Sequence, residues 1–129
     1  MNEKTLSVKD LNQEIVAELD FIKIADVETL TYPEAENMFD QLFAWLKPGT
    51  QIEFPVPDFT CIFELYQRDR YASAVFNKLV FTPGRQSVWD EMGIVQTLLT
   101  RGYYRVWTGR VEGYPDTHIC VRAVKLKRV

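Results

Sequence analysis

Apolar residues along the chain occur in two patterns: short continuous runs, and longer segments in which they repeat at helical spacing. The run FIKIADV at residues 21–27 is almost continuously apolar and rich in β-branched side chains. This pattern predicts a strand buried on both faces, as in a parallel sheet. Residues 51–56 predict the next strand, and a short one is expected at 5–8. Proline has no N–H to donate, so we expect pairing to stop near Pro55.

Helical spacing predicts a long helix between the two main strands. Its opening, Thr31-Tyr32-Pro33-Glu34, suits a first turn, where proline is tolerated and an acidic residue is favoured by the helix dipole. The pair Pro48-Gly49 ends it. Further helices are expected at about 10–19 with Asp10 as cap, 58–66 with Asp58 as cap, 71–80, and 87–101 with Gly102 as its end.

The end of the chain predicts an antiparallel hairpin, with strands at 103–111 and 117–126 joined by a turn at 112–116. The order of elements therefore indicates an α/β fold with parallel strands, helical crossovers and a C-terminal hairpin. A length of 129 residues with 47% hydrophobic residues is typical of one globular domain, which we expect to span residues 1–129.

Charge and composition narrow the function classes. The net charge of −3 argues against a nucleic-acid binder that relies on a broad basic surface. No apolar run approaches the ~20 residues that span a bilayer, so no membrane association is expected. Cys61 and Cys120 form no CxxC pair, which makes a metal site improbable. The polar N-terminus shows no signal peptide, and a cytoplasmic location is expected.

Four segments, taken in order, resemble the C-terminal half of a class I S-adenosylmethionine (SAM)-dependent methyltransferase. They are FIKIADVETL, MFDQLFAWLKPGTQIEFPVPDF, DEMGIVQTLLTRGYYRVWTG and HICVRAVKLK. The similarity covers about residues 20–127, after an N-terminal segment at 1–19. It implies a partial Rossmann-like sheet whose fourth and fifth family strands are residues 21–27 and 51–56.

The same resemblance implies that the main cofactor contacts are missing. The family holds SAM with a glycine-rich turn after its first strand and with an acidic residue at the end of its second strand. Here the first glycine is Gly49, far beyond the first family-like strand. We therefore expect no cofactor, with SAM bound only if a partner completes the site. No catalytic, cofactor-binding or metal-binding residue is assigned.

A ligand cleft is expected at the carboxyl ends of the parallel strands, where this fold opens. The candidates for lining it are Asp26, Glu28, Tyr32, Asp58, Arg85 and Trp89. Glu28 matches an acidic position of the family, but Thr29 stands where the family often has histidine. Asp58 has a simpler role as a helix cap. His118, at the start of the last strand, is expected opposite the cleft-facing ends and is left out of the site.

Without the first half of the fold, the outer edge of the strand at 21–27 would be open and apolar. Either residues 5–8 cover it, or two copies pair there; we predict a homodimer. The first functional hypothesis is a non-catalytic, dimeric interaction or regulatory module with a possible protein partner. The alternatives are a methyltransferase subunit whose cofactor half comes from a partner, and a small-ligand binder that uses the leftover cleft.

Overall fold

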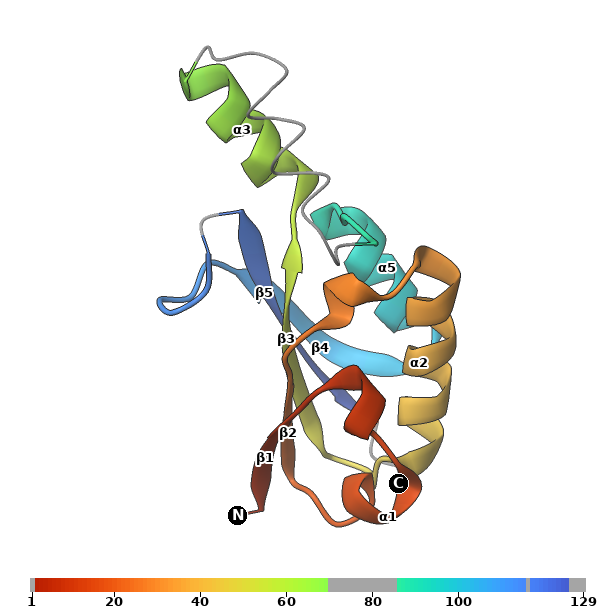
Figure 1. Cartoon of the computed structure of the whole chain (residues 1–129). Coiled ribbons are helices and arrows are strands. Elements are labelled where there is room, and N and C mark those ends of the chain that lie inside the picture. Colours follow the sequence, from red (N-terminus) through yellow and green to blue (C-terminus); the bar gives the residue numbers. More distant parts are fainter. Residues whose placement is uncertain (1, 70–85, 116, 126–129) are drawn as a thin grey trace.

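The computed structural model describes residues 2–69, 86–115 and 117–125. Within them, five strands form one sheet in the order β1-β2-β3-β5-β4 (Figure 1). The strands are β1 (Glu3–Leu6), β2 (Phe21–Ile24), β3 (Gln51–Pro57), β4 (Tyr103–Gly109) and β5 (His118–Lys125). The first three are parallel, and β5 is antiparallel to both β3 and β4. The predicted fold class, parallel strands followed by a C-terminal hairpin, is confirmed.

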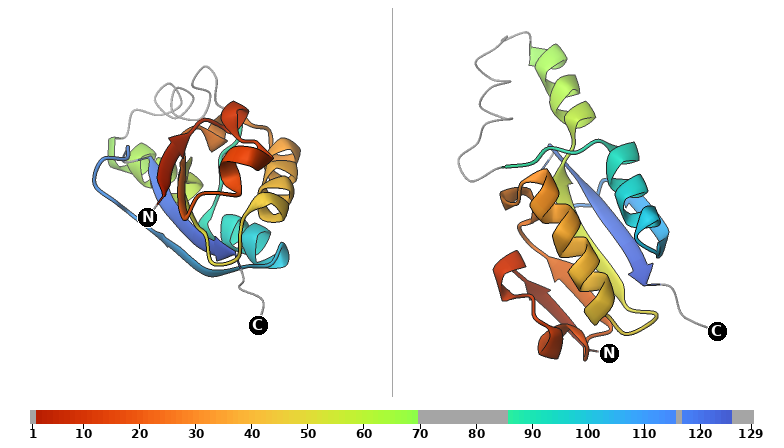
Figure 2. Two further views of the ribbon diagram at one scale, coloured as in Figure 1. Left: turned by 90° about the horizontal axis from the view of Figure 1, so that it is seen from below. Right: turned by 90° about the vertical axis from the view of Figure 1, so that its right-hand side faces the viewer.

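Helices connect the strands. They are α1 (Gln13–Val16), α2 (Tyr32–Trp45), α3 (Phe59–Asp69) and α5 (Glu91–Thr100), with 3-10 turns η1 (Val8–Asp10) and η2 (Val27–Thr29). Both α2 and α5 lie on the same face of the sheet (Figure 2), whereas α3 projects beyond the end of β3 (Figure 1). The helix predicted at 71–80 lies outside the described residues.

The ends of the helices follow local sequence rules. Thr31 and Glu34 form a capping box at the start of α2, with the Thr31 N–H donating to the Glu34 carboxylate over 3.0 Å. Gly102 ends α5 at a φ of +97°, and a Cβ there would meet the Phe43 ring at 2.8 Å. The cap predicted at Asp10 is wrong: Asn12 accepts the Ile15 N–H instead, and Asp10 belongs to η1.

The core lies between the sheet and the two helices that cover it. It includes Ile22, Ile52 and Phe54 from the strands, and the rings of Phe54 and Phe39 of α2 are 5.2 Å apart. The expectation that β2 is buried on both faces is wrong. Its side chains alternate between half-buried and buried, because successive side chains of a strand point to opposite faces and only Ile22 and Ile24 face the core.

The outer edge of β2 is covered by β1, which pairs with it from Glu3↔Phe21 to Leu6↔Ile24. This confirms a covering strand from the N-terminal segment, shifted by two residues from the predicted 5–8. An exposed β2 edge, on which the predicted dimer depended, is therefore absent. The exposed charged residues Glu3 and Lys4 lie on the short β1, a pattern that disfavours further edge pairing. The dimer itself stays a prediction.

The two prolines of β3 end pairing on one side only. Pairing with β2 stops at Glu53, as expected, but pairing with β5 continues to Pro57↔His118. The Gln51 N–H donates toward the β2 side, to the carbonyl of Asp20. Alternate residues of a strand point the same way, so the missing N–H groups of Pro55 and Pro57 also face that side. The ladder to β5 therefore loses no donor.

Candidate functional site

Polar side chains lie together along one edge of the sheet, the one formed by the carboxyl ends of its parallel strands. The parallel strands β1, β2 and β3 end there, and β5 begins there, because an antiparallel strand starts where its neighbour ends. His118 lies opposite Pro57 in this ladder. The expectation that it lies at the far end from the cleft is therefore wrong. The antiparallel order of the predicted hairpin could have placed it correctly.

Glu28 and His118 face each other at this edge. His118 Nε2 lies 3.1 Å from Glu28 Oε1, and His118 Nδ1 lies 2.7 Å from the hydroxyl of Thr117. The His118 side chain is buried. The Glu28 carbonyl accepts the N–H groups of Gln86 and Ser87 at 2.7 and 3.2 Å, which ties η2 to the segment that leads into α5.

Asp26 holds the turn after β1. Its carboxylate accepts the hydroxyl of Ser7 at 2.7 Å and the N–H of Val8 at 2.8 Å. Both carboxylate oxygens therefore accept hydrogen bonds from the connection between β1 and η1. This arrangement gives Asp26 a positioning role beside the cleft.

Trp89 joins the ends of three elements. Its backbone N–H donates to the carbonyl of Pro57 at 2.8 Å, and its own carbonyl accepts the N–H of Phe59 at 2.7 Å. Its buried ring stacks on Tyr32, with centroids 4.3 Å apart. The sequence prediction brought Tyr32 and Trp89 into one site, and the structure places them in contact.

Asp58 caps α3, as its simpler reading predicted. Its Oδ2 accepts the Cys61 N–H at 2.9 Å. Burial raises the pKa of the Cys61 thiol to about 11, and a hydrogen bond to Asp58 adds to this shift. The thiol therefore stays protonated at neutral pH and is a poor nucleophile. Arg85, the remaining predicted cleft residue, lies outside the described residues.

A cleft of about 430 Å³ opens beside this edge. Its lining includes Lys23, Ala25, Glu28, Pro55, Tyr114 and His118. Of the five predicted residues that the structure describes, only Glu28 is in this lining. Asp26, Asp58, Tyr32 and Trp89 support the elements around it. The lining combines a carboxylate, an ammonium group and an apolar floor, which suits a small molecule with polar groups at its ends.

A polar network beside the cleft, which shares Lys23 and Tyr114 with the cleft lining, was missed by the sequence analysis. Glu53 of β3 is buried, and its carboxylate accepts Arg122 Nε at 2.7 Å and the Tyr114 hydroxyl at 2.8 Å. Lys23 Nζ lies 4.0 Å away. Burial alone would raise the pKa of Glu53, but the bonds from Arg122 and Tyr114 outweigh it and leave that pKa lowered. The sequence contained a signal for this network, because Glu53 is a charged residue within an otherwise apolar strand.

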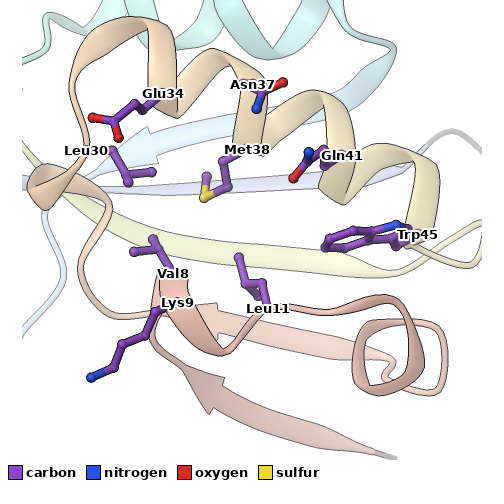
Figure 3. Close-up of a pocket in the computed structure, with 9 residues that line it drawn as sticks. All are labelled: Val8, Lys9, Leu11, Leu30, Glu34, Asn37, Met38, Gln41 and Trp45. Atoms are coloured by element: carbon purple, nitrogen blue, oxygen red, sulfur yellow. The ribbon is translucent and has the colours of Figure 1, made fainter.

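A second hollow, of about 320 Å³, lies on the helix side between η1 and α2 (Figure 3). Met38 points into it from α2, and Val8 and Leu11 face it from the other wall. The Glu34 carboxylate at its rim already serves the capping box. Its lining also includes Lys9, Asn37 and Gln41, but it holds no contacting pair of ionisable side chains such as Glu28 and His118. The cleft at the strand ends is therefore the better candidate for chemistry.

Among residues 2–69, 86–115 and 117–125, no helix is long and apolar enough to cross a membrane. In the same part of the chain, no three His, Cys, Asp or Glu side chains are grouped closely enough to hold a metal ion.

Comparison with known proteins identifies the fold. No family model and no curated protein matches the sequence. Human N-acetylserotonin methyltransferase in complex with SAM matches at 16% identity and a TM-score of 0.57, over 85% of this chain and 30% of that one. Magnesium protoporphyrin IX methyltransferase from Synechocystis PCC 6803, with bound SAH, matches at 15% and 0.54, over 92% and 48%. A possible exported protein from Bordetella parapertussis matches at 12% and 0.61, over 90% and 43%.

These likenesses confirm the resemblance to part of a SAM-dependent methyltransferase at the level of fold. This chain spans between 30% and 48% of the length of the three structures. The prediction of no cofactor is contradicted, because structures with this fold were determined with SAM and with SAH bound. The cytoplasmic location stays a prediction, since one similar structure is described as possibly exported.

Proposed function

We propose that this chain forms the substrate-side half of a SAM-dependent methyltransferase, with the methyl acceptor and the amino-acid end of SAM both bound in the cleft at the strand ends. The observation that carries the proposal is the coincidence of this cleft with the carboxyl ends of β2 and β3, where open α/β sheets bind ligands. The rest of the domain would come from the same polypeptide or from a partner. The non-catalytic hypothesis, which was based on the absent cofactor half of the fold, stays a prediction.

The cleft fits part of SAM, whose sulfonium centre would supply the methyl group. The Lys23 ammonium can pair with the carboxylate of the amino-acid end, and Thr5 adds a hydroxyl to the same wall. The turn after β1 fits less well, because the Val8 N–H is already bonded to Asp26 and the turn contains no glycine. We therefore propose that groups beyond the described residues hold the nucleoside end.

Nuclear magnetic resonance titration with SAH tests this proposal, because it detects even millimolar binding. We expect backbone amide shifts at Lys23, Ala25 and Glu28, and a several-fold weaker response in Lys23→Ala. Lys9→Ala, which removes an exposed lysine beside the other hollow, is the matched control and should respond like the wild type. If millimolar SAH causes no backbone amide shifts around the cleft, the proposal is contradicted.

A second proposal is that two copies of the chain associate through a surface other than the β2 edge, which β1 covers. The face opposite α2 carries Trp107, a large side chain that is 44% exposed and pairs with Arg122 across the ladder. Large exposed aromatic side chains are enriched at protein interfaces. We expect a dimer in light scattering coupled to gel filtration, and dissociation in Trp107→Ser. A monomeric wild type at micromolar concentration would contradict this expectation.

A further inference from the structure

A third hollow, of about 260 Å³, lies where α3 and α5 begin, beside the end of β4 and the start of β5. It shares no described lining residue with the cleft at the strand ends. Ile119 lines this hollow and belongs to the apolar core, whereas its neighbour His118 lines the cleft. Because consecutive side chains of a strand point to opposite faces, the hollow and the cleft are separate sites.

One carboxylate oxygen of Asp58, which lines this hollow, lacks a donor. Asp58 is 4% exposed, and its Oδ2 accepts the Cys61 N–H at the start of α3. Within the described residues, its Oδ1 is buried and has no hydrogen-bond partner. A buried acceptor that stays unpaired is unfavourable, and the cap of α3 needs only one of the two oxygens. The second oxygen therefore indicates a donor that arrives with a ligand.

The charges around the hollow define which donor fits. Glu64 and Glu91 line it together with Asp58, and Arg110 is the one cation of the described lining. Three carboxylates against one guanidinium leave a negative potential, which favours a cationic ligand. Asp58 and Glu91 also offset the positive ends of α3 and α5. That structural role does not supply a donor for Asp58 Oδ1.

Arg110 lies at the rim of the hollow and bonds elsewhere. Its Nη2 is 3.1 Å from Cys61 Sγ and 3.4 Å from Glu64 Oε2, and the side chains of Arg110 and Glu64 are 59% and 56% exposed. Exposed ion pairs contribute little to stability, so both side chains can move aside and open a path to the buried oxygen. A bound metal ion is a poor fit, because the described ranges contain no group of three His, Cys, Asp or Glu side chains that could hold one.

We propose that this hollow binds a small organic cation with a primary ammonium group. The ammonium has three N–H donors, one for Asp58 Oδ1 and others for the carboxylates of Glu64 and Glu91, and it takes the place of Arg110 beside Glu64. The Ile119 side chain offers an apolar contact for a short alkyl chain. This site goes beyond the proposed methyl transfer and does not depend on it.

Titration with n-butylammonium chloride, followed by ¹H–¹⁵N nuclear magnetic resonance, tests the site in the full chain. Sodium chloride at equal ionic strength is the reference. We expect a saturable shift of the Cys61 amide, which bonds to the Asp58 carboxylate, and of the Gly109 amide in the wall. Tetramethylammonium has the same charge but no N–H group, so it should bind several-fold more weakly. The absence of a saturable shift, or equal binding of the two cations, overturns the proposal.

Asp58→Asn separates ligand binding from helix capping. Asparagine also caps helices, and it replaces one carboxylate oxygen with an amide donor, so we expect several-fold weaker binding of n-butylammonium. Asp90→Asn is the matched control, because Asp90 caps α5 through the Gly93 N–H and does not line the hollow. It should bind like the wild type. Equal affinities of the two variants would contradict a role for Asp58.

Arg110→Gln tests the site without changing a helix cap. It removes the cation that competes for Glu64, so we expect n-butylammonium to bind several-fold more tightly than in the wild type. Unchanged or weaker binding would overturn the proposal. This comparison and the one with tetramethylammonium remain decisive if Asp58→Asn fails to fold.

Discussion

Different interactions stabilise the two faces of the sheet. On the helix side, Ile22, Ile52 and Phe54 are fully buried against apolar side chains. On the opposite face, the same strands carry Lys23 and Glu53, which contact other polar groups. Because strand side chains alternate, each strand supplies both faces. The helix side stabilises the fold through apolar burial, and the other face uses directional bonds that shape the cleft.

Glu53 shows why the second face needs its network. Its side chain is 5% exposed, whereas those of Arg122 and Lys23 are 39% and 41% exposed. Burying a carboxylate is unfavourable unless it is paired and hydrogen-bonded. The two cations and the Tyr114 hydroxyl meet this need. The Tyr114 bond also ties the turn before β5 to β3 beside the cleft.

The largest expected effect lies on the helix side. Phe54→Ala removes a fully buried ring that packs on Phe39, and we expect it to lower the free energy of unfolding by about 4 kcal/mol. Urea denaturation followed by circular dichroism measures this loss. Phe54→Leu leaves a smaller cavity and should cost clearly less. Equal losses in both variants would contradict cavity formation as the cause.

An intermediate effect is expected at Glu53. Glu53→Gln removes the charge from the buried network, and we expect a loss of about 2 kcal/mol at neutral pH. The pKa of Glu53 is lowered from its ordinary value of 4.5, so the ionised form stabilises the folded state. This contribution is present above pH 4.5 and is lost as the pH falls through the lower folded-state pKa.

Measuring the free energy of unfolding against pH separates this effect from a general loss. The wild type should lose stability on acidification below pH 4.5 more steeply than Glu53→Gln. Glu112→Gln, at an exposed turn, is the control and should keep the wild-type profile. Parallel acid profiles for the wild type and Glu53→Gln would show that the network does not depend on the Glu53 charge.

The helix side was the more predictable of the two faces. The capping box at Thr31 and Glu34 and the helix end at Gly102 depend on residues close in sequence, which local rules describe. The contact between Glu28 and His118 joins residues 90 positions apart, and the bonds to Glu53 come from positions 61 and 69 residues away. No local spacing encodes such pairs. They follow from strand order, in which β5 lies between β3 and β4.

The smallest expected effect comes from Tyr114, where the network meets the cleft. Tyr114→Phe removes one neutral donor to Glu53 while Arg122 still holds the carboxylate, so we expect a loss of about 1 kcal/mol. Tyr104→Phe, on β4, is the matched control and should change stability by less. If the two variants lose equal stability, the Tyr114 hydroxyl adds nothing beyond its ring. If Tyr114→Phe also weakens the response to SAH, the polar face supports ligand binding as well as the fold.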